Sequence, residues 1–289
     1  MATLSKKIDF AMIMSVKNAN PNGDPLNGNR PRTDYEGLGE MTDVCIKRKI
    51  RDRLVERFVS LKKEGQEKGQ AVFVQSDDRK CDEFKSLRTR AEAALGKDIG
   101  GTDTVKRACE EWIDVRAFGQ LFAFKSAKKG KNEGDTGISI GIRGPVTIQS
   151  AFSVEPVSVS STQITKSVNA EETKDGKRSS DTMGMKHRVD NGIYVTYGSM
   201  NPQLADRTKF SDEDAGVIKS ILPKLFENDA SSARPEGSMA VQKVIWWEHN
   251  SKAGQYSSAK VHKTLTVNTD GSYSLNNLDG LKPQEIDGF

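Results

Sequence analysis

The chain has 289 residues, of which 35% are hydrophobic and 29% are charged. This length predicts one large domain with insertions or two domains, and the composition excludes a wholly disordered protein. The sequence has no run of about 18 apolar residues, and its first residues lack the apolar core of a signal peptide. We therefore expect a soluble cytoplasmic protein without a transmembrane helix. The net charge of +4 is compatible with nucleic-acid binding but does not establish it.

The first part of the chain predicts a strand, a loop and a helix. Apolar residues alternate from Ile8 to Val16, which indicates a strand with one strongly buried face. A loop rich in Asn, Pro and Gly follows, from Asn18 to Gly39. Thr42 then occupies the N-cap position of a helix that we expect to end before Gly65. Its apolar stripe consists of Ile46, Ile50, Leu54, Phe58 and Leu61.

The middle of the chain predicts an insertion and two strands. Residues 65–107 are mostly charged or small, which favours an insertion that contains a short stretch of helix. Residues 111–125 have the pattern of a strand interrupted at Gly119, and residues 144–159 predict another strand. A polar loop at 125–137 separates the two.

A polar segment at 162–192 has β-branched residues near its ends and the turn signal Asp175-Gly176 near its middle. This pattern predicts a long exposed β-hairpin. Residues 193–200 follow as a strand. Residues 211–228 predict a helix that begins with a capping box and bends at Pro223.

Residues 239–250 predict the last large strand, and a hairpin-like tail follows around Asp270-Gly271. Without the insertions, the order is strand, helix, strand, strand, helix, strand. This α+β order is that of the split βαβ or ferredoxin-like arrangement, and also of the RNA-recognition fold.

The first predicted helix carries a cluster of cations at its start. At about 100° per residue, Lys47 falls inside the apolar stripe, Arg51 at its edge and Arg48 further round. Near a helix start, free backbone N–H groups and the helix dipole favour an anion, and the polar loop ends at the same place. This combination predicts a site for a phosphate chain. A solvated helix whose lysine reaches water, with charges partly balanced by Asp43 and Asp52, explains the same pattern.

Candidates for catalysis or metal binding are sparse. Asp24 and Asp34 lie in the polar loop at a spacing that permits a metal site, although such aspartates more often form turns and caps. No phosphate-binding glycine motif is present, so we expect no cofactor and no metal. The three cysteines lie far apart, which argues against a disulfide framework or a zinc site: Cys45, Cys81 and Cys109. The three histidines are scattered and none lies beside a cysteine or a serine elbow: His187, His249 and His262.

Four motifs occur in a specific order along the chain. They are SVKNANPNGDP after the first strand, MTDVCIKRKIRDRL on the first helix, DVRAFG at 114–119 and RGPVTIQSAFSVEPV at 143–157. Together, over roughly residues 8–250, they resemble the backbone subunit of CRISPR Cascade complexes, a member of the repeat-associated RNA-binding superfamily. The similarity is greatest to the type I-C version.

This resemblance implies one hand-shaped domain over residues 1–289, with a modified ferredoxin-like or RNA-recognition palm, inserted fingers and a β-hairpin thumb. The implied parts are a palm at about 8–60, 111–160 and 192–250, fingers at about 65–107, a thumb at about 162–190 and a C-terminal hairpin tail at 251–289.

The resemblance also implies a function. Several copies would form a helical filament on the CRISPR guide RNA, with thumbs displacing bases at intervals and the segments between them pairing with target DNA. The implied partners are the guide RNA, target DNA, other copies of the chain and the other Cascade subunits, namely the 5′-handle-capping, large and small subunits. The implied RNA-binding residues are Asn18, Asn20, Arg30, Lys47, Arg48, Arg51, Arg116, Phe118, Arg143, Gln149, Lys166, Met183, Met185 and Lys186.

Two other functions stay open. Related type III backbone subunits cut target RNA with a loop aspartate, so Asp24 or Asp34 makes a metal-dependent endoribonuclease an alternative; related processing enzymes often use histidine. A generic single-strand RNA-binding module is the second alternative, and the number of copies on one RNA distinguishes it from a filament subunit. No histidine lies near the basic helix in the sequence, and the aspartates have the neighbours of turn residues. We therefore expect a non-catalytic subunit.

Overall fold

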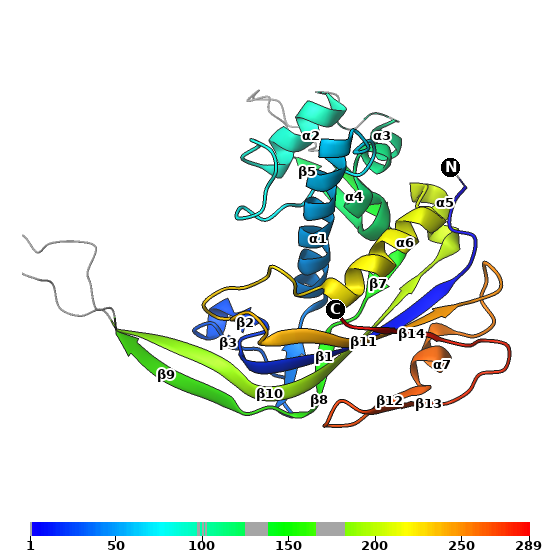
Figure 1. Cartoon of the computed structure of the whole chain (residues 1–289). Coiled ribbons are helices and arrows are strands. Elements are labelled where there is room, and N and C mark those ends of the chain that lie inside the picture. The colour runs from blue at the N-terminus through cyan, green and yellow to red at the C-terminus, as the bar shows by residue number, and fades with distance from the viewer. Residues whose placement is uncertain (1, 97–98, 100, 102, 125–137, 166–182) are drawn as a thin grey trace, which may run out of the picture.

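The computed structural model describes residues 2–96, 99, 101, 103–124, 138–165 and 183–289. Over these residues, an eight-stranded antiparallel sheet forms the centre of the molecule, with the strand order β14-β11-β1-β10-β8-β4 and with β7 and β9 also paired to β10 (Figure 1). The strands are β1 (Ile8–Ala19), β4 (Leu38–Met41), β7 (Val146–Ile148), β8 (Ala151–Pro156), β9 (Val159–Thr165), β10 (Met183–Met200), β11 (Met239–Glu248) and β14 (Gln284–Asp287).

Both faces of β1 are buried, whereas the sequence predicted one buried face. Phe10 and Met12 belong to the cluster under the helices, and Ala11 and Ile13 belong to a second cluster on the opposite face. The polar alternation expected of a half-exposed strand is therefore missing, because layers cover the sheet on both sides.

One sheet face, which we call the helix face, packs against α1 (Asp43–Glu64), α6 (Asp212–Ile221) and α5 (Pro202–Thr208). The predicted start and end of α1 are confirmed. Thr42 Oγ1 accepts a hydrogen bond from the Cys45 amide at 3.2 Å, and Gly65 follows the helix in the left-handed conformation. The apolar stripe faces the core, where Ile46, Ile50 and Leu54 are buried.

The predicted capping box of α6 is also confirmed, since Ser211 and Asp214 exchange hydrogen bonds at 3.0 and 3.2 Å. The helix does not continue through Pro223 with a bend. It ends at Ile221 and passes into the 3-10 helix η2 (Leu222–Lys224), because proline supplies no amide hydrogen to the helical ladder.

The opposite sheet face, the second face, is covered by the C-terminal segment (Figure 1). Its elements are α7 (Ser258–His262), β12 (Leu265–Val267) and β13 (Tyr273–Leu275). The pairing of β12 with β13 around Gly271 confirms the hairpin predicted in the tail. Val261, Leu265 and Leu281 are buried against the sheet.

The inserted region gathers beside the far end of α1 (Figure 1). It contains α2 (Leu87–Leu95), α3 (Thr104–Glu111), α4 (Ile113–Phe118) and a hairpin of β5 (Gly119–Phe124) with β6 (Ile138–Arg143). Phe73, Trp112 and Phe122 form the aromatic centre of a separate core, with ring centroids 4.6 to 6.2 Å apart.

The strand predicted over 111–125 is wrong in its first half, which is the helix α4. Trp112 and Val115 pack into the inserted core, whereas Ile113 and Ala117 pack into the main core. The buried residues Asp114 and Arg116 alternate with apolar neighbours, and this alternation has the period of a strand instead of a helix. At Gly119, with φ of 82°, a Cβ atom would lie 2.2 Å from the Ile142 carbonyl oxygen, so glycine is needed where the helix passes into β5.

Among the described residues, no helix has the length and apolar character required to cross a membrane.

Candidate nucleic-acid interface

The polar loop between β1 and α1 is ordered by its own side chains. It contains the short strands β2 (Gly23–Asp24) and β3 (Arg30–Pro31), which pair, and the 3-10 turn η1 (Pro25–Asn27). Asp24 Oδ1 accepts from the Leu26 amide at 3.1 Å and lies 3.3 Å from an Arg32 nitrogen. Asp34 Oδ1 accepts from the amides of Glu36 and Leu38 at 2.9 and 2.8 Å. Both carboxylates thus perform the turn-forming role that aspartate commonly has in loops.

Two asparagines hold the loop in place, one at the start of α1 and one within the loop. Asn22 Oδ1 accepts from both the amide and the hydroxyl of Thr42 at 3.0 Å. Asn20 is buried, and its side-chain amide donates to the Asn29 carbonyl at 2.7 Å. Arg30 is exposed on the same loop, and Asn18 is exposed near the end of β1. Asn22 therefore joins the loop to the start of the basic helix, and Asn20 acts as an internal anchor of the loop.

The cations of α1 face two different environments. Lys47 is half-buried and pairs with Asp43 at 2.9 Å, and Arg48 is exposed beside Asp78 at 3.2 Å. Arg51 instead points inward, where its Nε atom lies 3.0 Å from the buried Asp114 carboxylate. Lys47 and Arg48 are consequently available at the surface, whereas Arg51 is engaged in the interior.

Asp114 and the ring of Phe118 complete the environment of Arg51. The Asp114 carboxylate also accepts from the amides of Phe73 and Val74 at 2.7 and 3.1 Å, and the Arg51 guanidinium lies 5.1 Å from the centroid of the Phe118 ring. This geometry attaches α1 to α4 and to the inserted region. It gives Arg51 and Phe118 a role in packing, and the RNA contact that the resemblance implied for them stays a prediction.

Arg116 likewise has a full set of internal partners. Its guanidinium makes a bidentate pair with Asp214 at 2.8 and 2.7 Å, and it donates to the carbonyls of Gly69 and Cys109 at 2.6 and 3.3 Å. Only 9% of the side chain is exposed. A planar guanidinium suits such a fixed, multiply bonded site. Arg116 thus links α4 to α6, and its implied RNA contact stays a prediction.

The two remaining palm residues lie on other elements than α1 and its loop. Arg143 is exposed at the end of β6, in the inserted hairpin. Gln149 lies between β7 and β8 and lines a hollow together with Val195, Tyr197 and Val267. These neighbours belong to the second face, whereas α1 covers the helix face. The structure therefore does not bring Gln149 together with the cations of α1.

A two-stranded arm projects from the sheet (Figure 1). We use the name arm for β9 together with residues 183–189 of β10, which pair from Met183↔Thr165 to Val189↔Val159. The same strand continues into the sheet beside β1, where Val189 pairs with Ala19 and Met200 with Ile8. The two sides of the hairpin predicted over 162–190 are thus observed. Its predicted turn at Asp175-Gly176, and Lys166, lie outside the described residues.

The two faces of the arm differ in chemistry. Side chains alternate along a strand, so Met183 and Met185 share one face, and Ile164, Lys186 and Arg188 share the other. The exposed fractions are 65% for Met183, 54% for Met185 and 50% for Ile164. One face therefore presents two thioether side chains, and the other presents two cations.

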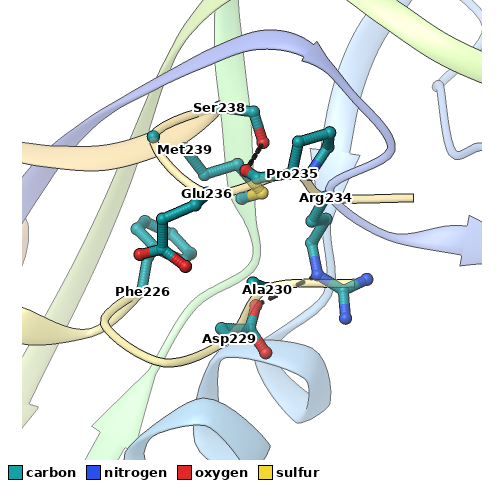
Figure 2. A pocket seen from close by; sticks show the side chains of 9 residues that line it. Phe226, Asp229, Ala230, Arg234, Pro235, Glu236, Ser238 and Met239 are labelled. Carbon is teal, nitrogen blue, oxygen red and sulfur yellow. Dashed lines mark hydrogen bonds and ion pairs between the residues drawn. The ribbon is translucent and has the colours of Figure 1, made fainter. Parts of the chain in front are cut away.

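The loop that follows η2 packs beside α1. The sequence did not predict this contact. Figure 2 shows a small pocket in this loop, where Arg234 Nε pairs with Asp229 at 3.0 Å. Asp229 also pairs with Lys49, a buried residue of α1, and burial lowers the pKa of that lysine. The backbone amide of Asn20 donates to the Ala233 carbonyl at 2.9 Å. Lys49 and Asp229 are 180 positions apart, so no local pattern could indicate this contact.

Comparisons with known proteins identify the family. The family model described as CRISPR-associated protein Cas7 matches residues 6–284. The chain therefore belongs to the Cas7 family, which confirms the family indicated by the four motifs. The CRISPR-associated protein Cas7 of Haloferax volcanii is 23% identical over 292 residues, covering 95% of this chain and 79% of that relative.

Two solved structures are also similar. One is a chain described as "CRISPR RNA-guided surveillance complex, pre-nicking", with 14% identity, a TM-score of 0.43 and coverage of 83% of this chain and 78% of that chain. Another, described as "CRISPR RNA-guided surveillance complex", has 16% identity, a TM-score of 0.43 and coverage of 95% and 77%.

Proposed function

We propose that this Cas7-family chain is a non-catalytic backbone subunit that binds CRISPR guide RNA and polymerises along it in a cytoplasmic type I Cascade complex. The observation that carries the proposal, besides family membership, is the arm. Its outer part, residues 183–188 of β10, pairs with β9 beyond the strands that border the sheet, and it exposes two methionines. Exposed apolar side chains on a projecting element are typical of an interaction site.

The proposed RNA path begins at the start of α1. Lys47 and Arg48 lie there, Arg30 is exposed on the loop anchored to the same helix start, and Asn18 is exposed near the end of β1, before this loop. A helix start with adjacent cations favours phosphate, and such contacts carry no sequence information. Base pairing of the guide with target DNA would then supply sequence specificity.

The arm is proposed to act as the thumb. Met183 and Met185 present flexible, polarizable side chains that suit contact with the faces of unstacked bases. Lys186 and Arg188 face the other way and are placed to contact phosphate or an acidic surface of a neighbouring copy. Assembly of copies on one RNA would be stabilised by these contacts, which must offset an unstacking cost of a few kcal/mol.

We also propose that the centre of the chain is a modified ferredoxin-like palm. The elements β1, α1, β8, β10, α6 and β11 follow each other in the order strand, helix, strand, strand, helix, strand, and their strands lie in the order β11-β1-β10-β8. This arrangement supports a split βαβ unit. The type I-C subtype, the pairing with target DNA and the other Cascade subunits as partners belong to the same proposal.

RNA-dependent assembly tests the proposal. Sedimentation of the purified chain alone, and with guide RNAs of increasing length, should show discrete species whose number of copies rises with RNA length. A single copy on every RNA would indicate a generic RNA-binding module. The same oligomer with and without RNA would contradict a filament subunit.

The absence of catalysis is tested separately. Asp24 and Asp34 hold loop amides, which supports a structural role for both carboxylates. We expect the assembled complex to leave a complementary RNA intact in the presence of Mg²⁺ or Mn²⁺. Metal-dependent cutting that is lost in Asp24→Ala or Asp34→Ala would establish the endoribonuclease alternative instead.

A further inference from the structure

A buried cluster of ionisable groups lies where the C-terminal segment meets the sheet. Asp9 of β1 and His249, which follows β11, are both fully buried. Lys7 precedes β1, and His262 is the last residue of α7. The proposed RNA function uses none of these groups, and together they join the first strand to the segment that covers the second face.

The hydrogen bonds determine the proton positions on His249. Its Nδ1 atom accepts from the Gln255 amide at 2.9 Å, so the proton lies on Nε2, which donates to Asp9 Oδ2 at 2.8 Å. Lys7 Nζ lies 3.2 Å from the same carboxylate oxygen and donates to the Tyr256 carbonyl at 2.8 Å. Lys7 therefore already pairs with the Asp9 carboxylate, and His249 binds the same oxygen through Nε2.

His262 occupies the other side of the Asp9 carboxylate. Its Nε2 atom donates to the Gly198 carbonyl at 3.2 Å and lies 3.6 Å from Asp9 Oδ1, which has no hydrogen-bond partner. The imidazole stacks on the Tyr197 ring at a centroid distance of 4.9 Å. The pKa of His262 lies below its ordinary value of 6.5, chiefly because burial penalises the imidazolium, and Lys7 acts in the same direction.

We propose that this cluster is an acid-sensitive latch, in which protonation of His262 loosens α7 and the β12–β13 hairpin from the second face of the sheet. A proton on Nδ1 adds a second positive charge to a buried site where one carboxylate already pairs with Lys7. The groups facing His262 are Asp9 from β1, Lys7 before β1, His249 across the carboxylate and Tyr197 from β10. Asp9 attracts the new charge, but burial and Lys7 outweigh it.

The lowered pKa of His262 determines how docking of the C-terminal segment changes with pH. The docked imidazole binds a proton less readily than the released one, so acid favours release. Docking is at full strength above the released pKa of 6.5, and it weakens as the pH falls through that value toward the lower pKa of the docked state. Released α7 would expose the apolar residues Ile13, Ile245 and Trp247 of the second face.

Amide hydrogen exchange measured by mass spectrometry tests the latch. Between about pH 7.5 and about pH 5.5, after correction for intrinsic exchange, peptides over 256–275 should lose protection by roughly threefold to tenfold, whereas peptides of β1 should not. His262→Asn removes the titrating group and should abolish this change. His187→Asn is the matched control, because His187 is buried in the arm, where it bonds to Ser161 at 2.8 Å, and it should leave the change intact.

A second variant tests the latch independently, in case His262→Asn does not fold. Lys7→Met removes the competing cation, so Asp9 would favour the imidazolium and the acid-induced loss of protection should shrink. Loss of protection that persists unchanged in His262→Asn, or that is equally large in β1, would overturn the latch. An acid response in Lys7→Met as large as that of the unaltered chain would overturn it as well.

Discussion

The junction of α1, α4 and α6 and the projecting arm use the same kinds of charged side chain in opposite ways. At the junction, Arg116 pairs with Asp214 and Arg51 pairs with Asp114, away from solvent. On the arm, Lys186 is exposed, and Arg188 is exposed at 3.7 Å from the equally accessible Asp190. Removal of one partner of a buried pair leaves the other charge buried and uncompensated, which destabilises the fold. An exposed pair contributes little to stability. The charges of the junction therefore fix the position of helices, and those of the arm stay available for a ligand.

Replacement of Arg116 should give the largest difference in the free energy of unfolding between a junction variant and an arm variant. Arg116→Met leaves the buried Asp214 carboxylate without its bidentate partner, and we expect the free energy of unfolding to fall by about 3–5 kcal/mol. Arg188→Met is the matched control on the arm and should change it by less than about 0.5 kcal/mol. Urea denaturation measures both. Similar values for the two variants would remove the distinction between junction and arm.

A smaller loss of stability is expected for Arg51→Met. The Asp114 carboxylate keeps its bonds to the amides of Phe73 and Val74, so the loss should be about 2 kcal/mol. The folded variant should bind RNA with an unchanged salt dependence, because Arg51 faces inward. If the salt dependence of RNA affinity falls while stability is preserved, Arg51 contacts the guide, as the motif resemblance implied.

The sequence predicted those elements whose signals are local. The limits of α1 follow from Thr42 and Gly65, and the start of α6 follows from Ser211 and Asp214, because each signal acts within one helical turn. The helix α4 was missed because residues 112–117 are buried against two cores at once. Local pattern cannot distinguish strand from helix under those conditions.

The candidate site was predictable only in part, for a related reason. The exposed position of Arg48 follows from the helical wheel, whereas the wheel placed Lys47 inside the apolar stripe, and Lys47 is half-buried and paired with Asp43. Arg116 resembled a binding residue because its partner, Asp214, is 98 positions away. Lys49 and Asp229 are likewise distant in sequence, so their pairing depends on the tertiary fold. A charged residue inside a motif therefore does not reveal whether its partner is internal.

The smallest predicted effect concerns the surface of α1. Arg48→Ala removes an exposed cation beside Asp78, so stability should change by less than about 1 kcal/mol. RNA binding should weaken by about the same small amount for all sequences, and the slope of affinity against salt should fall by about one. Filter binding over a range of salt concentrations provides the measurement. An unchanged slope would place the RNA away from the start of α1.

Native mass spectrometry of an arm variant on guide RNA tests the central claim most directly. Met183→Ser combined with Met185→Ser alters only the thioether face, and Ile164→Ser is the control for an exposed apolar residue on the opposite face. The double variant should bind a short RNA as one copy like the unaltered chain, and should need at least about tenfold more protein to place several copies on a long RNA, a loss of about 1.4 kcal/mol. Equal multi-copy assembly by the double variant, or an equal loss in Ile164→Ser, would contradict the assignment of the methionine face of the arm to assembly.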